Sequence, residues 1–152
     1  MSALESFAGR WFVVKIGGGL ALDVKKLSRT VGRAVRGFLD AGLKVAVVHG
    51  GGPQATELSK KLGLVTRQVA GQRVTDEATL EVMKQVLGGV GVNVAQAMRL
   101  AQVQAISTSG VSAGLVEATR RPPVRIGDEE VDYGLVGDVT NVNITLLEAL
   151  AK

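Results

Sequence analysis

The sequence predicts an α/β protein, a three-layer sandwich with a mostly parallel sheet and a β-hairpin insertion. Apolar, β-branched runs alternate with segments of helical periodicity, which is typical of a parallel sheet covered by helices. Two of these runs end in three consecutive glycines, at residues 17–19 and 50–52. Beyond residue 114 the helical period gives way to short apolar runs separated by turn residues, which predicts the hairpin.

The first predicted strand, Trp11–Ile16, is a continuous apolar run with one lysine, and we expect it to be buried on both faces. Asp23 is a suitable N-cap for a helix that runs to about Ala41, and Gly42 stands where a C-cap glycine is expected. One apolar stripe of this helix, spaced at i and i+4, consists of Leu27, Val31, Val35 and Leu39.

A second buried strand is predicted for Lys44–Val48. Pro53 suits the first turn of a helix that ends near residues 62–63. Short extended pieces follow over residues 64–74, with a turn at Gly71.

Asp76 and Glu77 begin a long helical pattern, whose apolar face consists of Leu80, Met83, Leu87 and Val90. Glycines at 88, 89 and 91 should weaken this helix, since each costs roughly 1 kcal/mol relative to alanine. We expect it to resume through residues 93–101, packed closely against a neighbour at the glycines. Residues 103–108 are predicted as a third strand, followed by a polar turn over residues 109–114.

The last part of the chain is predicted to contain three short strands and a helix. The strands are Leu115–Ala118, Val124–Ile126 and Leu135–Val142, and Ile144–Ala151 is apolar at helical spacing.

Composition narrows the possible functions. The 152 residues suit one domain, residues 1–152. The absence of cysteine excludes disulfides and thiolate metal sites, and a single histidine excludes multi-histidine metal sites. A net charge of +4 suits anionic small molecules, but the scattered basic residues and 3% aromatic content argue against nucleic-acid binding. No uncharged run approaches membrane-spanning length, so we expect a cytoplasmic protein without a membrane partner.

The two glycine loops are the strongest functional signal. Glycine lets backbone N–H groups approach an anion closely, and two such loops at neighbouring strand ends would form a phosphate-binding nest. Lys15, at the end of the first strand, would add positive charge. The alternative is a pair of tight turns that need small residues, with Lys15 extending into solvent. Neither loop has a Walker A or a dinucleotide-binding pattern.

Other charged residues carry weaker signals. Arg73 could bind a carboxylate bidentately or form a surface ion pair with Asp76 or Glu77. We expect His49 to orient its loop through a backbone hydrogen bond. The arginines 120, 121 and 125 are interpreted as a solvated hairpin face, and the acidic residues 128–138 as exposed turns rather than a metal site.

Several motifs together resemble the acetylglutamate kinases of the amino-acid kinase family, in the family's order and at compatible spacing. They span nearly the whole chain: Lys15-Ile16-Gly17-Gly18, residues 49–54 (His-Gly-Gly-Gly-Pro-Gln), residues 71–76 (Gly-Gln-Arg-Val-Thr-Asp), Asn93 and residues 132–139 (Asp-Tyr-Gly-Leu-Val-Gly-Asp-Val). Where the family commonly has Asp-Gly after the third strand, this chain has Ser112-Ala113.

The resemblance implies transfer of the ATP γ-phosphoryl group to the side-chain carboxylate of N-acetyl-L-glutamate, in arginine biosynthesis. It implies that Lys15 stabilises the transferring phosphoryl group, and that the amides of Gly18 and Gly51 hold it. Gly51, Gly52 and Arg73 would contact the substrate, with Arg73 on the α-carboxylate. The hairpin around residues 132–143 corresponds to the family's lid over the substrate.

The resemblance also implies a second lobe that binds ATP and Mg²⁺. We therefore expect residues 1–152 to form only the N-acetyl-L-glutamate-binding lobe, with little or no activity alone. A homodimer through the long helix, residues 76–101, is implied as well. The short lead-in has little room for the extra helix of arginine-sensitive relatives, so no arginine inhibition is expected.

Three alternatives stay open at this stage. The first is a non-catalytic half-kinase that serves as a binding or assembly module. The second is the similar family of carrier-protein-linked aminoadipate kinases of lysine biosynthesis, and the third is an unrelated phosphate-binding α/β protein.

Overall fold

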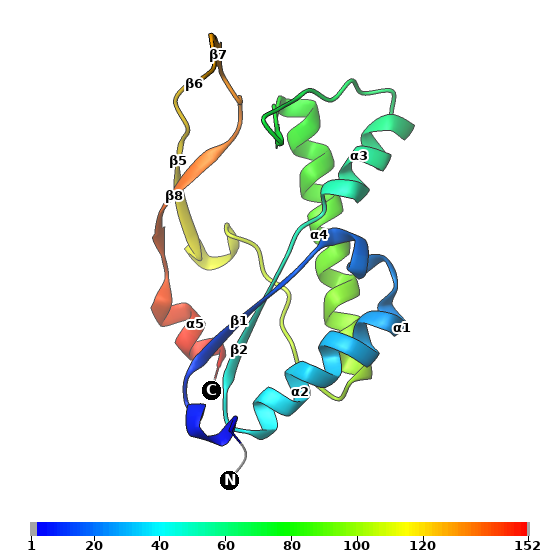
Figure 1. Cartoon of the computed structure of the whole chain (residues 1–152), viewed down its shortest axis with the longest axis vertical. Helices are drawn as coiled ribbons and strands as arrows, with labels where there is room; N and C mark the ends of the chain where they lie inside the picture. Colours follow the sequence, from blue (N-terminus) through cyan, green and yellow to red (C-terminus); the bar gives the residue numbers. More distant parts are fainter. Residues whose placement is uncertain (1–2, 152) are drawn as a thin grey trace. The chain divides into compact units, whose positions relative to one another are not determined.

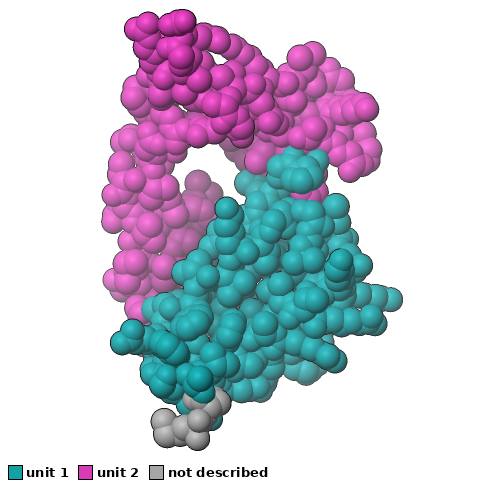
Figure 2. Space-filling view, in the orientation of Figure 1, with its two compact units in different colours: residues 1–53, 87–108, 151 teal, residues 54–86, 109–150, 152 magenta. Residues whose placement is uncertain are grey.

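The structure, a computed structural model, describes residues 3–151 and divides into two compact units. Unit 1 comprises the chain up to residue 53, residues 87–108 and residue 151, and unit 2 comprises residues 54–86 and 109–150 (Figure 2). Each unit mixes helices with strands, and unit 1 contains a parallel strand pair, so the predicted α/β class is confirmed.

In unit 1, strands β1 (Trp11–Ile16) and β2 (Lys44–His49) pair in parallel, from Trp11 opposite Lys44 to Ile16 opposite His49. A short 3-10 turn, η1 (Glu5–Phe7), precedes β1. The prediction that these strands are buried on both faces is wrong, because Val13 is 70% exposed and Val48 50%. Among the residues described, this sheet has two strands only.

The predicted first helix is confirmed, although it is not a regular α-helix throughout. After the 3-10 turn η2 (Gly18–Leu22), it runs through α1 (Val24–Leu27), a π-helical turn η3 (Ser28–Gly32) and α2 (Arg33–Asp40). Asp23 caps it by accepting a 2.9 Å hydrogen bond from the Lys26 N–H. Gly42, with φ +82°, follows its end. Of the predicted stripe, Leu27 and Val35 are buried, whereas Leu39 is exposed.

The long helix α4 (Glu77–Leu100) is continuous through its glycines, so the predicted weakening does not break it (Figure 1). Its residues up to 86 belong to unit 2 and the rest to unit 1. Burial of Val90, Val94 and Met98 supplies packing energy that outweighs the low helix propensity of glycine. As expected, one glycine packs closely: a side chain at Gly91 would collide with Ser107.

Residues 103–108 do not form the predicted third strand. Val103 is buried at the start of the segment, but the backbone that follows pairs with no strand among the residues described. An apolar run adopts strand structure only when a neighbouring strand accepts its backbone hydrogen bonds.

In unit 2, helix α3 (Gly52–Lys61), whose first two residues belong to unit 1, ends before Gly63 at φ +71°, as predicted. A tight hairpin joins β3 (Gln68–Val69) to β4 (Gln72–Arg73). Its two turn residues, Ala70 and Gly71, both have positive φ, at 48° and 77°. This is the turn geometry that two-residue hairpins favour.

The predicted hairpin insertion is present as a nested antiparallel ribbon (Figure 1). Strand β5 (Val116–Arg120) pairs with β8 (Gly137–Val142), and at the tip β6 (Val124–Ile126) pairs with β7 (Glu129–Val131). The 3-10 turn η4 (Ser112–Gly114) precedes the ribbon and contains Ala113 at φ 50°, a conformation that favours glycine. Helix α5 (Ile144–Leu150) follows, capped by Asn143.

The prediction missed β7, since Glu129 and Glu130 resemble turn residues until a partner strand is present. Among residues 3–151, no helix is both long and apolar enough to cross a membrane.

Replacement of two glycines of the first helix by alanine should change stability in opposite directions. A Cβ at Gly32 would lie 2.7 Å from Ala101 Cβ, whereas a Cβ at Gly37 would meet nothing within 4 Å. Gly32→Ala should lower the free energy of unfolding by about 1–3 kcal/mol through overpacking. Gly37→Ala, the matched control, should raise it by about 0.5–1 kcal/mol. Urea denaturation followed by circular dichroism measures both free energies. An unfolding free energy of Gly32→Ala equal to that of the wild type would contradict the close contact between Gly32 and Ala101.

Candidate functional site

The two glycine loops leave the same edge of the sheet in unit 1. Strands β1 and β2 are parallel, and their last aligned pair is Ile16 opposite His49. Residues 17–19 and 50–52 follow directly after this pair. Ligands of open α/β sheets bind at the carboxyl ends of strands, so the loops occupy the position expected for a ligand site.

No glycine of these loops has a positive φ that would favour glycine, and at four of the six positions internal packing does not require glycine either. None of residues 17–19 and 50–52 has positive φ, and Gly17 is extended at φ −71° and ψ 147°. Among the residues described, a Cβ built at Gly17, Gly19, Gly50 or Gly52 would meet no atom within 4 Å. A remaining physical reason for glycine is close approach of an external group to the backbone.

Lys15 lies on β1 opposite Val48 and is exposed. Its ammonium has no hydrogen-bond or ion-pair partner among residues 3–151. Because side chains alternate along a strand, Lys15 shares the exposed face with Val13. The positively charged Lys15 therefore lies two residues before the first glycine loop, at the sheet edge that both loops share.

His49 does not make the predicted loop-orienting bond through Nδ1. This nitrogen is buried and has no hydrogen-bond partner among the residues described. The other ring nitrogen, Nε2, lies 3.4 Å from where a Cβ of Gly91 would be, so the ring packs over a helical glycine.

Arg73 lies on β4 in unit 2, where its Nη2 donates a 2.7 Å hydrogen bond to Oγ1 of Thr56 on α3. The same residue lines a cavity of about 330 Å³. The lining residues are Gln72, Arg73, Thr75, Met83, Arg121 and Val136. Of these, only Arg73 was identified from the sequence as a site residue.

The chemistry of this cavity suits a small organic anion. Arg73 supplies positive charge, whereas the charge of Arg121 is balanced by its ion pair with Asp138. Gln72 and Thr75 supply hydrogen-bonding groups, and Met83 and Val136 supply apolar surface. Cavities that bind small molecules commonly occupy about 300–1,000 Å³ and combine apolar walls with a few polar groups.

One wall of the cavity is fixed by backbone bonds between Thr75 and the segment that follows β7. Thr75 N donates to Tyr133 O at 2.9 Å, and Leu135 N donates to Thr75 O at 2.7 Å. Gly134, at φ +73°, permits this contact, because a Cβ there would collide with the Thr75 carbonyl. The Tyr133 hydroxyl also donates to Val69 O at 3.2 Å.

The interpretation of the hairpin arginines as a solvated face is wrong for Arg121. Arg120 pairs with Asp132 at 2.9 Å and its side chain is 64% exposed, as expected of a surface pair. Arg121 pairs with Asp138, is only 25% exposed and lines the cavity. Sequence analysis did not identify Arg121 as a cavity residue because the segments that cover its side chain are distant in sequence. Within residues 3–151, no group of three or more His, Cys, Asp or Glu is placed to hold a metal ion.

The sequence-predicted site residues thus fall into two sets. Lys15, Gly18, Gly51 and Gly52 lie at the sheet edge of unit 1, whereas Arg73 lies in the cavity of unit 2.

The fold and these two sets of residues define an α/β protein suited to anionic ligands, and the chain matches the Amino acid kinase family over residues 10–152. It therefore belongs to that family. It is 48% identical over 143 residues to an acetylglutamate kinase from Anaeromyxobacter dehalogenans (strain 2CP-C), an alignment covering 89% of this chain and 51% of that protein. An acetylglutamate kinase from Sorangium cellulosum (strain So ce56) is 44% identical over 148 residues, and the alignment covers 92% of this chain and 50% of that protein.

Solved structures show the same fold. The protein smu.665 from Streptococcus mutans UA159 superposes with a TM-score of 0.76 at 28% identity, covering 93% of this chain and 54% of that one. An N-acetylglutamate synthase from Neisseria gonorrhoeae, complexed with coenzyme A and N-acetyl-glutamate, superposes with a TM-score of 0.74 at 21% identity. The superposition covers 96% of this chain and 32% of that one. The chain spans about half the length of the curated relatives it matches.

Asp76, which follows the segment carrying Arg73, should make stability depend on acid pH. It caps α4, and hydrogen bonds from the Thr79 side chain and backbone N–H lower the pKa of its carboxyl. A carboxyl whose pKa is lower in the folded state than in the unfolded state stabilises the protein at pH values above the unfolded-state pKa. This stabilisation is lost as the pH falls through the folded-state pKa. Asp76→Asn keeps a capping oxygen, so it should reduce the loss of melting temperature between pH 6 and pH 3. Asp128→Asn, in an exposed turn, is the control. An equal loss in wild type and Asp76→Asn would contradict this role.

Proposed function

We propose that this chain forms the N-acetyl-L-glutamate-binding part of an acetylglutamate kinase, which transfers the ATP γ-phosphoryl group to the substrate's side-chain carboxylate. One observation carries the proposal: two glycine loops, in which no glycine has positive φ, share a sheet edge with Lys15. The chain's kinase relatives support the choice of reaction.

In the proposed mechanism, Lys15 and the amides of Gly18 and Gly51 stabilise charge on the transferring phosphoryl group. A carboxylate is already ionised at neutral pH, so the nucleophile needs no general base. Catalysis can then rest on positioning and on charge stabilisation, as is usual in phosphoryl transfer. Each well-placed donor could lower the barrier by roughly 3–4 kcal/mol.

Arg73 is proposed to bind the α-carboxylate of the substrate, and Gly51 and Gly52 to contact the substrate through their backbone. The charge and apolar surface of the unit 2 cavity support the assignment of Arg73. A guanidinium can hold a carboxylate with two parallel hydrogen bonds, which fixes orientation as well as affinity.

ATP and Mg²⁺ are proposed to bind mainly to the part of the kinase that this chain does not match. The residues described contain no cluster of metal-ligating side chains, and we assign no step to magnesium on this chain. Residues 1–152 would then act as one substrate-binding domain of a cytoplasmic enzyme of arginine biosynthesis.

Calorimetry with two ligands tests the proposal. The chain should bind N-acetyl-L-glutamate and show little heat with ATP. Arg73→Ala should weaken N-acetyl-L-glutamate binding by roughly 10- to 100-fold, since it removes a charged hydrogen-bonding group. The control is Arg125→Ala, an exposed ribbon arginine whose Nε donates to Gly127 O.

The alternatives give different results. Binding of neither ligand would contradict the kinase proposal and favour a structural module. Nucleotide affinity that survives Arg73→Ala, without N-acetyl-L-glutamate binding, would favour a different phosphate-binding protein. Preference for a carrier-linked aminoadipate over free N-acetyl-L-glutamate would favour the lysine-biosynthesis kinases.

A homodimer through α4 is also proposed. The face of the helix carrying Gly88, Val92 and Gln96 is exposed, with Val92 at 64%. A Cβ at Gly88 would meet nothing within 4 Å, so a partner helix could approach closely. Val92→Glu should convert a dimer into a monomer in sedimentation velocity, whereas Ala34→Glu, on exposed α2, should not. A wild-type monomer at high micromolar concentration would refute the proposal.

A further inference from the structure

We propose that Arg121 is a positioning residue, which holds strand β4 so that Arg73 faces the cavity. The inference rests on the proposed function for the identity of the ligand. The placement of Arg73 can be tested separately from that identity.

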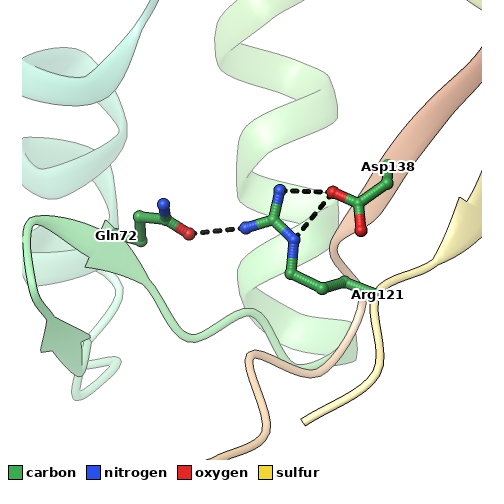
Figure 3. Close-up of polar contacts among 3 residues, drawn as sticks. All are labelled: Gln72, Arg121 and Asp138. Atoms are coloured by element: carbon green, nitrogen blue, oxygen red, sulfur yellow. Dashed lines mark hydrogen bonds and ion pairs between the residues drawn. The ribbon is translucent and has the colours of Figure 1, made fainter. Parts of the chain in front are cut away.

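The Arg121 guanidinium joins two segments that are distant in sequence (Figure 3). Its Nη1 donates to Gln72 Oε1 at 2.6 Å. Its Nε and Nη2 donate to Asp138 Oδ1 at 2.8 and 2.6 Å. The side chain therefore links β4 to β8 while itself belonging to the connection between β5 and β6.

The arginine of this link is less exposed to solvent than the arginines in the other ion pairs of the ribbon. The Arg121 side chain is 25% exposed, compared with 64% for Arg120 and 58% for Arg67. Exposed pairs contribute little because solvent screens them and the long side chains lose entropy. A sheltered guanidinium with three hydrogen bonds is held in one orientation, so it can position its partners.

The partners of Arg121 are next to cavity residues in the chain. Gln72 is followed by Arg73, and the two make up all of β4. The main chain of Arg121 also donates from its N–H to Val136 O at 2.8 Å, and Val136 lines the cavity. On the other side of Arg73, Thr75 is bonded to Tyr133 and Leu135. Arg73 is thus held between a backbone link at Thr75 and a side-chain link at Gln72.

The link requires an arginine. A planar guanidinium can reach an amide on one side and a carboxylate on the other, whereas a lysine ammonium is a point charge without this fork. The hydrogen bonds from Arg121 to Asp138 raise the pKa of the guanidinium, so it stays charged. Arg121→Lys therefore keeps the charge near Asp138 and removes the bridge.

The experiment uses the chain with N-acetyl-L-glutamate as the probe and has two readouts. The first is the Nε–Hε NMR resonance of Arg73 without ligand, and the second is affinity by calorimetry. The variants are Arg121→Lys, Gln72→Leu and their double mutant. The control is Arg120→Lys, which alters the neighbouring exposed pair with Asp132. Thermal unfolding verifies that each variant is folded.

Arg121→Lys and Gln72→Leu should each shift the Arg73 resonance and weaken binding about tenfold. The double mutant should also lose about tenfold rather than a hundredfold, because both changes break one link. Arg120→Lys should change neither readout. An unchanged Arg73 resonance in both single variants would overturn the positioning role, as would equal effects in Arg120→Lys.

The two proposals can fail separately. If the wild-type chain does not bind N-acetyl-L-glutamate, the proposed function fails, and the Arg73 resonance alone decides whether Arg121 positions it. If the wild type binds and Arg121→Lys binds equally well, the positioning role is overturned while the proposed function stands.

Discussion

The parallel pairing of β1 with β2 is the constraint on which the proposed phosphate site depends. The two strands are separated by a helical crossover, and their alignment ends with Ile16 opposite His49. This register brings two glycine loops to one edge of the sheet. A register shift of one residue would also invert which side chains face the core, so burial of Ile16 helps to fix the alignment. The loops need no side-chain contact with each other to share this edge.

Unit 2 depends on polar contacts in addition to buried apolar side chains. The β3–β4 hairpin and the ribbon are small elements that bury few side chains, and isolated hairpins are marginally stable in water. They are held by the Thr75–Gly134 backbone link, by Tyr133 and by the Arg121 bridge. These polar contacts act together with apolar burial, because Val131 and Tyr133 are buried here as Leu27 and Met98 are in unit 1. The Arg73 cavity lies beside these links, because Thr75 and Arg121 both line it.

Much of the fold could be predicted because its signals are local. Asp23 and Gly42 bound the first helix, and Ala70-Gly71 form the expected turn. Other features depended on partners that the sequence does not reveal. Residues 103–108 have the composition of a strand but pair with no strand in the described part of the chain, whereas Glu129 and Glu130 form a strand because they pair with β6. The glycines of α4 were expected to weaken a helix that packing keeps continuous.

The sequence by itself determined the α/β class, the two glycine loops with Lys15, and Arg73 as a candidate for binding a carboxylate. These follow from residue type, spacing and resemblance, which are properties of short segments. Only the tertiary structure decided that both loops share an edge, that packing does not require four of their six glycines, and that Arg121 lines a cavity with Arg73. The physical reason is that register, burial and hydrogen-bond partners are set between segments far apart in the chain, and side-chain chemistry alone does not specify which segments meet.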